Sequence, residues 1–297
     1  MTDLLSINIG MDPNVVRVFG LLITWHGVFT AVGIVAGVWL AVGIASSQRV
    51  GIDADTAYTV GLVVVASGIV GARLLYALEN YGDNPSLDSF GDLFRINEGG
   101  ISIYGAIIGG ALGGWAYGLW KRLRCAAAAD AAAFAMLLGL AVGRIGDIIN
   151  GEHFAKTSDL PWAMTYSHPN STAFFREAMH PAVAYEMIGD LVILGIIALI
   201  WRLQPKSGVV FSLAFILYAV MRFFVSFLRL DSKEPLLGLS TPQLVSILVL
   251  AVAIPVLLYF LLRREPEPGP EQTGGARAPA RRGVSRAERR RRLRAGS

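Results

Sequence analysis

The chain has 297 residues, of which 54% are hydrophobic and only 16% are charged, and its mean hydropathy is +0.54. This composition excludes an ordinary water-soluble enzyme and indicates a protein that lies in a lipid bilayer. The formal net charge of +4 does not indicate a nucleic-acid partner, because residues 263–297 hold eleven Arg and four Glu, which leaves residues 1–262 at −3. We therefore expect no binding to nucleic acid.

Taken in chain order, seven apolar runs are each long enough to cross a hydrocarbon core about 30 Å thick as a helix. They cover residues 20–45, 57–80, 100–120, 126–150, 183–202, 207–229 and 241–262. The stretch before them, residues 1–19, has no basic region ahead of an apolar run and does not resemble a removable signal peptide. The sequence predicts an all-α membrane protein, a bundle of about seven transmembrane helices preceded by an N-terminal arm.

The loops between these runs differ in charge, and cytoplasmic loops are the ones rich in Lys and Arg. Residues 121–124 (KRLR), the 202–206 loop and residues 263–297 are basic and share one side, whereas the 81–99 loop is acidic and lies opposite. We expect the N-terminus outside, the C-terminus in the cytoplasm, and a periplasmic segment at 151–182. The Pro-, Gly- and Arg-rich tail is expected to be disordered and attracted to anionic lipid.

Polar and charged side chains of the spanning runs collect near their outer ends. A charge at a helix centre costs about 2.5–3.5 kcal/mol, so each one requires a partner or a water-filled cavity. Six runs supply side chains at this level: Trp25, His26, Arg73, Tyr104, Arg144, Asp147, Glu186, Arg222 and Arg229. Arg outnumbers the acidic residues, which favours a phosphate ligand, because Arg binds phosphate bidentately. Asp130 and Asp190 lie deeper or nearer the inner side, and we predict no function for them.

Helical spacing groups these residues further, since residues three or four apart share a face. The fourth run carries Arg144, Asp147 and Asn150 on one face, and the sixth carries Tyr218, Arg222, Ser226 and Arg229. A purely structural alternative is that Arg144 pairs with Asp147 and Arg222 with Glu186, without any ligand. Glycines at four-residue steps, at 105, 109 and 113 and at 139 and 143, are interpreted as helix packing.

Several motifs resemble those of one known family. The run GRIGDIINGE at 143–152, followed by PWAM at 161–164, resembles the signature of prolipoprotein diacylglyceryl transferases. The remaining motifs follow in the order and spacing of that family: GGISIYGAIIGG at 99–110, His180-Pro181 with Tyr185-Glu186, Tyr218 followed by Arg222, and Leu239-Ser240 with Gln243. The resemblance covers residues 20–262 and leaves the tail outside.

The resemblance implies a seven-helix enzyme of the bacterial inner membrane. Such an enzyme transfers diacylglycerol from phosphatidylglycerol to the lipobox cysteine thiol of a preprolipoprotein and releases glycerol phosphate. The implied partners are phosphatidylglycerol, preprolipoprotein signal peptides with a lipobox cysteine, and the bilayer itself. No cofactor and no metal are implied, and the active site would face the periplasmic, outer leaflet.

The resemblance also implies roles for single residues. By motif position, Arg144 and Arg222 would hold the headgroup phosphate and stabilise the leaving glycerol phosphate. The residues that would line and orient the site are Asn150, Glu152, Glu186 and Tyr218. Tyr104 stands where many members of the family have a histidine proposed as the base. We place Arg73 and His26 among the phosphatidylglycerol-binding residues, because both lie near outer helix ends.

The chain departs from the family pattern at four positions: Tyr104 replaces the histidine, Asp147 an asparagine, Ala155 a glycine and Ser226 a glutamate. Asp147 either pairs with Arg144, the interpretation that we favour, or has taken over proton removal from the thiol. One other function stays open, that of a non-catalytic paralogue that binds anionic lipid or lipoprotein precursors. A transporter is disfavoured, because it requires polar groups near the membrane centre and paired halves, which this sequence lacks.

Overall fold

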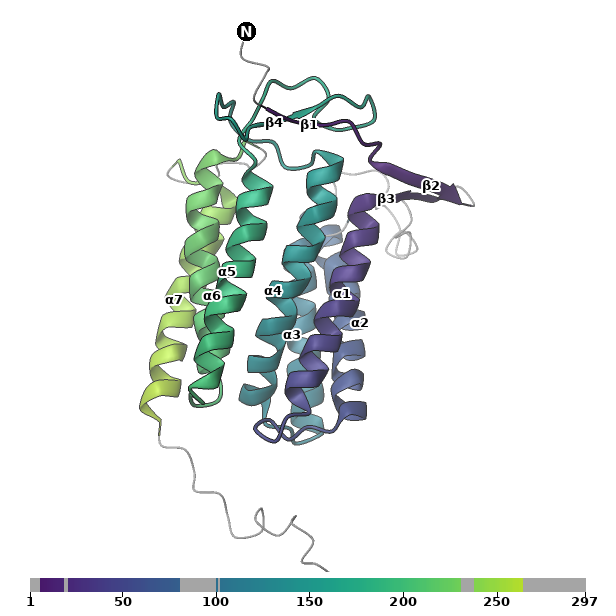
Figure 1. The fold of residues 1–297 in the computed structure, drawn as a ribbon. Coiled ribbons are helices and arrows are strands. Elements are labelled where there is room, and N and C mark those ends of the chain that lie inside the picture. The colour runs from purple at the N-terminus through teal and green to yellow at the C-terminus, as the bar shows by residue number, and fades with distance from the viewer. Residues whose placement is uncertain (1–5, 19–20, 81–99, 101, 231–237, 264–297) are drawn as a thin grey trace, which may run out of the picture. The chain divides into compact units, whose positions relative to one another are not determined.

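A computed structural model describes residues 6–18, 21–80, 100, 102–230 and 238–263 of the chain. Within these ranges the protein is helical, with four short strands (Figure 1). The helices are α1 (Trp25–Ala45), α2 (Ala54–Glu79), α3 (Ile103–Trp120), α4 (Cys125–Asn150), α5 (Ala182–Arg202), α6 (Val209–Val225) and α7 (Thr241–Leu262), and α6 continues into the 3-10 turn η4 (Ser226–Leu228). The strands are β1 (Ile7–Ile9), β2 (Asn14–Val18), β3 (Leu21–Thr24) and β4 (Met164–Tyr166). The predicted acidic loop at 81–99 and the tail beyond residue 263 lie outside the described residues.

The seven helices match the seven predicted runs, but the first helix begins at Trp25 rather than at residue 20. The preceding residues form β3, which pairs antiparallel with β2, and the hydroxyl of Thr24 accepts a hydrogen bond from Gly27 N at 3.3 Å. A side-chain cap of this kind fixes the first turn of a helix. The prediction of helix before Trp25 was therefore wrong.

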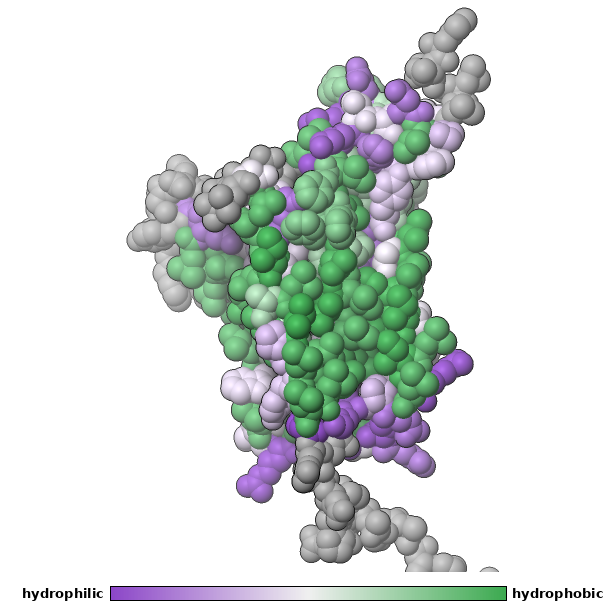
Figure 2. Space-filling view, turned by 90° about the vertical axis from the view of Figure 1, so that its left-hand side faces the viewer, coloured by the Kyte–Doolittle hydropathy of each residue, from purple (hydrophilic) through white to green (hydrophobic). Residues whose placement is uncertain are grey.

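Six of the seven helices are long and apolar enough to cross a membrane. The exception is α3, whose glycines and aromatic residues lower its hydropathy. Figure 2 shows one face of the protein that is apolar across its middle and hydrophilic toward its ends. Large apolar side chains such as Trp39, Leu62 and Leu248 point outward, as a lipid-facing surface requires. The number of spans and the orientation of the chain stay predictions.

The helices pack mainly as α1 against α4, α2 against α3, and α4 against both α5 and α6. The pair of α2 and α3 crosses at glycines, where a Cβ added to Gly71 would lie 2.4 Å from the carbonyl oxygen of Gly105. Such contact between backbones is possible only without side chains. This supports the packing interpretation of the glycine steps at 105 and 109, whereas Gly143 has open space around its Cβ position.

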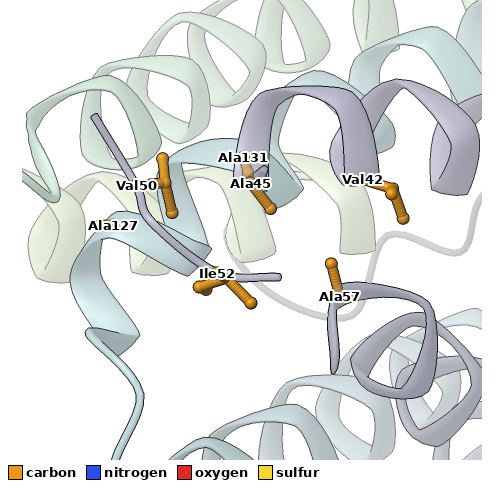
Figure 3. Close-up of a cluster of buried hydrophobic side chains, with 7 residues drawn as sticks. All are labelled: Val42, Ala45, Val50, Ile52, Ala57, Ala127 and Ala131. Carbon is orange, nitrogen blue, oxygen red and sulfur yellow. The ribbon is translucent and has the colours of Figure 1, made fainter. Parts of the chain in front are cut away.

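Two apolar clusters fill the interior of the bundle. The larger joins α4, α5 and α6 and includes Leu137, Ile197 and Val210, which have no exposed surface. The second lies where the turn after α1 meets the start of α4 (Figure 3), and consists of Val42, Ala45, Val50, Ile52, Ala57, Ala127 and Ala131. The small residues of this second cluster let α1 and α4 approach closely.

The end of the bundle covered by β1 and β4 is called the strand end below. Strand β1 pairs in parallel with β4, with Ile7 opposite Met164 and Ile9 opposite Tyr166. The hydroxyl of Tyr166 donates to the carbonyl of Ile148 at 2.9 Å, and that of Ser171 donates to the carbonyl of Asn150 at 3.0 Å. Burial raises the pKa of Tyr166, so its hydroxyl keeps its proton and this hydrogen bond at neutral pH. The 151–182 segment is thereby held against the last turns of α4.

Asp130, for which the sequence predicted no function, has a structural one. Its side chain lies between α4 and the start of α6 and is only 1% exposed. The carboxylate accepts hydrogen bonds from Gly208 N and Phe211 N, both at 2.8 Å. These backbone groups have no partner within the helix, and the helix N-terminus attracts negative charge. Asp130 therefore caps α6 from another helix.

Candidate active site

Three arginines converge on Glu186 in the first turns of α5, one from α4, one from α6 and one that directly follows η4. Arg144 Nη2 lies 2.5 Å from Glu186 Oε2, Arg229 Nη1 donates to Glu186 Oε1 at 3.0 Å, and Arg222 Nη1 donates to the same oxygen. Glu186 is only 1% exposed. A buried carboxylate of this kind is tolerable because it is ion-paired and hydrogen-bonded. The contact between Arg222 and Glu186 is the one that the purely structural alternative expects, and it is present.

Guanidinium groups dominate this cluster. Three of them share Glu186, and Arg144 also pairs with Asp147. The Nε atom of Arg144 is buried and has no hydrogen-bond acceptor among the described residues. The side chains of Arg144 and Arg222 retain 14% and 15% exposure, so that a ligand can reach them. A cluster with these properties is suited to an anion with several oxygens, such as a phosphodiester.

Asp147 links the arginine cluster to α1. Its Oδ2 accepts a hydrogen bond from Arg144 Nη1 at 2.9 Å, and its Oδ1 lies 2.5 Å from His26 Nδ1. His153 Nε2 lies 3.7 Å from Asp147 Oδ2. The expected contact between Asp147 and Arg144 is thus confirmed, and His26 is a second partner that the sequence did not predict.

The end of α4 and the residues after it add two polar groups. Asn150 Nδ2 donates to Glu152 Oε1 at 2.9 Å, and Glu152 Oε2 lies 3.7 Å from His26 Nδ1. The Oδ1 atom of Asn150 is buried and has no hydrogen-bond donor in the described part of the chain. The helix ends at Gly151, whose φ of 72° is a left-handed conformation that favours glycine. This turn brings Glu152 back toward His26.

Two further residues lie along the same faces. Tyr218 is half-buried one turn before Arg222 on α6, where it packs on the α4–α5–α6 core. Asp190 lies one turn after Glu186 on α5, is fully buried, and has no hydrogen-bond partner for either carboxyl oxygen among the described residues. Both positions are close to the arginines, but the geometry assigns neither a chemical step.

Arg73 and Tyr104 lie on the α2–α3 side of the bundle. Arg73 Nη1 donates to the carbonyl of Gly100 at 2.7 Å, and its guanidinium lies 5.4 Å from the ring centre of Tyr76. Tyr104 is half-buried in the first turn of α3. The structure therefore gives Arg73 a role in joining α2 to the start of α3, and its predicted contact with lipid stays a prediction, as does the role of Tyr104.

Two residues of this region were not among the predicted site residues. Arg229 was recognised at the outer end of the sixth run and on its polar stripe but was given no role, and η4 turns the chain there and directs its side chain to Glu186. His153 adopts a left-handed backbone, with φ of 65°, next to Asp147. Neither a local motif nor helical spacing points to His153, because its position depends on the turn after α4.

His26, Asp147 and Glu152 bring potential metal-ligand atoms within 4.8 Å of one another. The distance of 2.5 Å between His26 Nδ1 and Asp147 Oδ1, however, is shorter even than an ordinary hydrogen bond. Two ligands of one zinc ion with bonds of about 2.1 Å lie about 3.4 Å apart in tetrahedral geometry. We therefore treat the pair as hydrogen-bonded, not as part of a metal centre.

The fold indicates a helical, multi-pass membrane protein, and an arginine-rich cluster lies at the strand end of its bundle. A family profile described as prolipoprotein diacylglyceryl transferase matches residues 13–259, and the chain belongs to this family. It is 31% identical to a Dehalococcoides mccartyi protein over 261 residues, which cover 86% of this chain and 96% of that relative. It is 32% identical to a Clostridioides difficile protein over 225 residues (75% and 85% of the two chains) and 33% identical to an Acaryochloris marina protein over 265 residues (86% and 93%). All three relatives are named phosphatidylglycerol–prolipoprotein diacylglyceryl transferase.

Proposed function

We propose that this protein is a transferase that moves the diacylglyceryl group of phosphatidylglycerol to the lipobox cysteine thiol of a preprolipoprotein, releasing glycerol phosphate. Family membership over residues 13–259 supports this activity. The structural observation that supports this activity most strongly is the convergence of Arg144, Arg222 and Arg229 on one buried carboxylate. That cluster of guanidinium groups matches the phosphodiester that the reaction has to hold and break.

The exposed edges of Arg144 and Arg222 bind the headgroup phosphate, and Glu186 holds both guanidinium groups in place. As the carbon–oxygen bond to the phosphate breaks, negative charge gathers on the leaving glycerol phosphate. Fixed donors in a low-dielectric site stabilise that charge more in the transition state than in the ground state. Asn150, Glu152 and Tyr218 line the same region and orient the substrates.

The thiol substrate requires a base. A cysteine thiol has a pKa of about 8.5, so only about 3% of it is thiolate at pH 7. A positioned base that takes the proton speeds such a step by about 10²–10⁴-fold. Asp147 stands one helical turn from Arg144 and is the departure from the family pattern that bears most directly on this step.

Transfer of labelled diacylglycerol from phosphatidylglycerol vesicles to a synthetic lipobox peptide tests the proposal. Wild-type protein should label the peptide on its cysteine and release glycerol phosphate in equal amount, and a peptide with serine in place of that cysteine should stay unlabelled. Binding of vesicles and peptide without any transfer would instead identify a non-catalytic paralogue.

We further propose that the strand end faces the periplasmic, outer leaflet of the bacterial inner membrane, with residues 121–124 and the tail in the cytoplasm. The alternation of Lys and Arg between loops supports this orientation. Cys125, the only cysteine, begins α4 at the opposite end and tests it. In intact spheroplasts an impermeant maleimide should leave the wild type unlabelled and should label Asn170→Cys, since Asn170 is exposed at the strand end. Labelling of Cys125 from outside would invert the proposed orientation.

A further inference from the structure

The His26–Asp147 pair is a feature of this structure that the proposed phosphate-binding role does not explain. His26 is the second residue of α1, and Asp147 lies in the last turn of α4, 121 positions later. Gly146 makes the approach possible, because a Cβ at that position would lie 2.6 Å from His26 Cα and 2.8 Å from the carbonyl oxygen of Trp25. The backbones of the two helices therefore touch where the pair forms.

The hydrogen bond determines the tautomer of His26. An ionised carboxylate only accepts hydrogen bonds, so Nδ1 of His26 carries the proton that it donates to Asp147 Oδ1. The other ring nitrogen, Nε2, is then left with a lone pair, and no hydrogen bond from a described residue reaches it. A neutral imidazole in this tautomer is ready to accept a proton at Nε2.

Exposure separates the two members of the pair. The His26 side chain is 44% exposed, whereas that of Asp147 is 5% exposed and has both carboxyl oxygens occupied by His26 and Arg144. A substrate can therefore reach the imidazole but not the carboxylate. The charged or titratable groups that face His26 from the end of α4 and the following turn are Asp147, Glu152 and, on the far side of Asp147, Arg144 and His153.

We propose that His26 is the general base that removes the thiol proton, and that Asp147 is a positioning residue that holds the imidazole in the reactive tautomer. This inference rests on the proposed transferase function. His26 and Arg144 bind the two oxygens of one carboxylate, so Asp147 holds the proposed base and the phosphate-binding arginine next to each other. The pair thus connects the base that activates the nucleophile with the arginine that binds the leaving group.

The thiol proton passes to His26 Nε2, and the thiolate sulfur attacks the glyceryl carbon that carries the phosphate. A carbon–sulfur bond forms, the carbon–oxygen bond breaks, and its electron pair leaves with the phosphate oxygen as glycerol phosphate held by Arg144 and Arg222. Imidazolium, stabilised by Asp147, then returns its proton to the leaving phosphate or to water.

Tyr104, at the position of the usual histidine, is less suited to this step. A phenol has an ordinary pKa of about 10, so it is protonated at neutral pH and is a poor acceptor for a thiol proton. The first turn of α3 also gives it no hydrogen bond from a described residue that would fix its orientation. Replacement of the usual histidine by Tyr104 is consistent with a base that lies elsewhere in this chain.

The test compares His26→Gln and Asp147→Asn with His168→Gln in the vesicle and peptide assay, measured from pH 6 to 10. His168 is a matched control, because its Nε2 lies 3.8 Å from Asp12 Oδ2 and it too is partly exposed at the strand end. We expect His26→Gln to lower kcat at pH 7 by about 10²–10⁴-fold, with a change in KM for phosphatidylglycerol of less than about threefold. The deficit should shrink toward pH 9.5, where a thiol of pKa about 8.5 ionises unaided. His168→Gln should behave as the wild type.

Recovery at high pH also shows that His26→Gln is folded, so loss of structure cannot imitate the result. Asp147→Asn should lower kcat at pH 7 by about tenfold or more and move the rising limb of the pH profile upward. The proposal is overturned if His26→Gln keeps wild-type kcat at pH 7, or loses activity equally at every pH. It is also overturned if Asp147→Asn keeps or raises the wild-type activity, which is the result expected if Asp147 only pairs with Arg144. A third contrary outcome is that EDTA abolishes transfer by the wild type and zinc restores it. Absence of transfer by the wild type would refute the transferase function itself.

Discussion

Asp130 and Glu186 are two buried carboxylates, each 1% exposed, that lie toward opposite ends of the same bundle. Backbone N–H groups of Gly208 and Phe211 satisfy Asp130, whereas the side chains of three arginines surround Glu186. A carboxylate whose two oxygens accept backbone hydrogen bonds serves the fold. A carboxylate shared by three guanidinium groups holds those cationic groups together in one place. The partners of a buried acid, more than its burial, therefore separate a structural group from part of a binding site.

The largest effect is expected from Arg144→Lys. The two Nη atoms of Arg144 join different carboxylates, Asp147 and Glu186, and a single ammonium group cannot span both. Transfer should fall by about 10²–10³-fold, the loss that follows removal of one fixed donor. The measurement is kcat/KM for phosphatidylglycerol in the vesicle assay.

Arg49→Lys is a matched control at the end of the bundle that carries Asp130. Arg49 also uses both Nη atoms, which donate to the carbonyls of Trp201 and Pro205, and its guanidinium lies 3.7 Å from the centre of the Trp201 ring. Its replacement should leave transfer per folded enzyme unchanged. Equal losses of activity in the two lysine variants would show that the two ends do not differ as described.

A smaller effect, on stability alone, is expected from Asp130→Ala. The change removes the acceptor of two backbone N–H groups at the start of α6 and should destabilise the protein by about 2 kcal/mol, the upper range for a helix cap. The thermal unfolding midpoint of purified protein in detergent should fall. The unfolding midpoint of Asp130→Asn, which keeps one acceptor oxygen, should fall less. Transfer by the folded fraction at low temperature should match the wild type, and a selective loss of kcat would instead place Asp130 in the site.

The smallest effect concerns the link between the N-terminal arm and the 151–182 segment. Hydrogen bonds from Asn14 N and Asn170 Nδ2, together with nearby His168, lower the pKa of Asp12. A lowered pKa means that the ionised form stabilises this link above about pH 4, the ordinary value for aspartate, and that the contribution is lost as the pH falls through the lowered pKa. Amide exchange in β1 and β4 should accelerate below pH 4 in the wild type. Asp12→Asn should show less dependence on pH over the same range.

The sequence predicts the helices well and the contacts between distant residues poorly. Long apolar runs locate the helices, because a bilayer demands them, but hydropathy could not show that residues 21–24 pair with β2 instead of starting α1. Helical spacing placed Asp147 beside Arg144, a contact within one turn. The hydrogen bond from His26 to Asp147 spans 121 residues, and the cap on α6 spans 78. Such contacts depend on which helices pack together, and a single sequence contains no direct record of that.

The parallel pairing of β1 with β4 also constrains how the protein is made. Ile7 pairs with Met164, so the first strand is synthesised long before its partner and before α4 is complete. At about 5–20 residues per second, the interval is roughly ten to thirty seconds. Throughout that time the first strand presents an open edge that another chain can pair with. A nascent chain stalled before residue 164 would thus have its first helices in place and its N-terminal arm still open to proteases and chaperones.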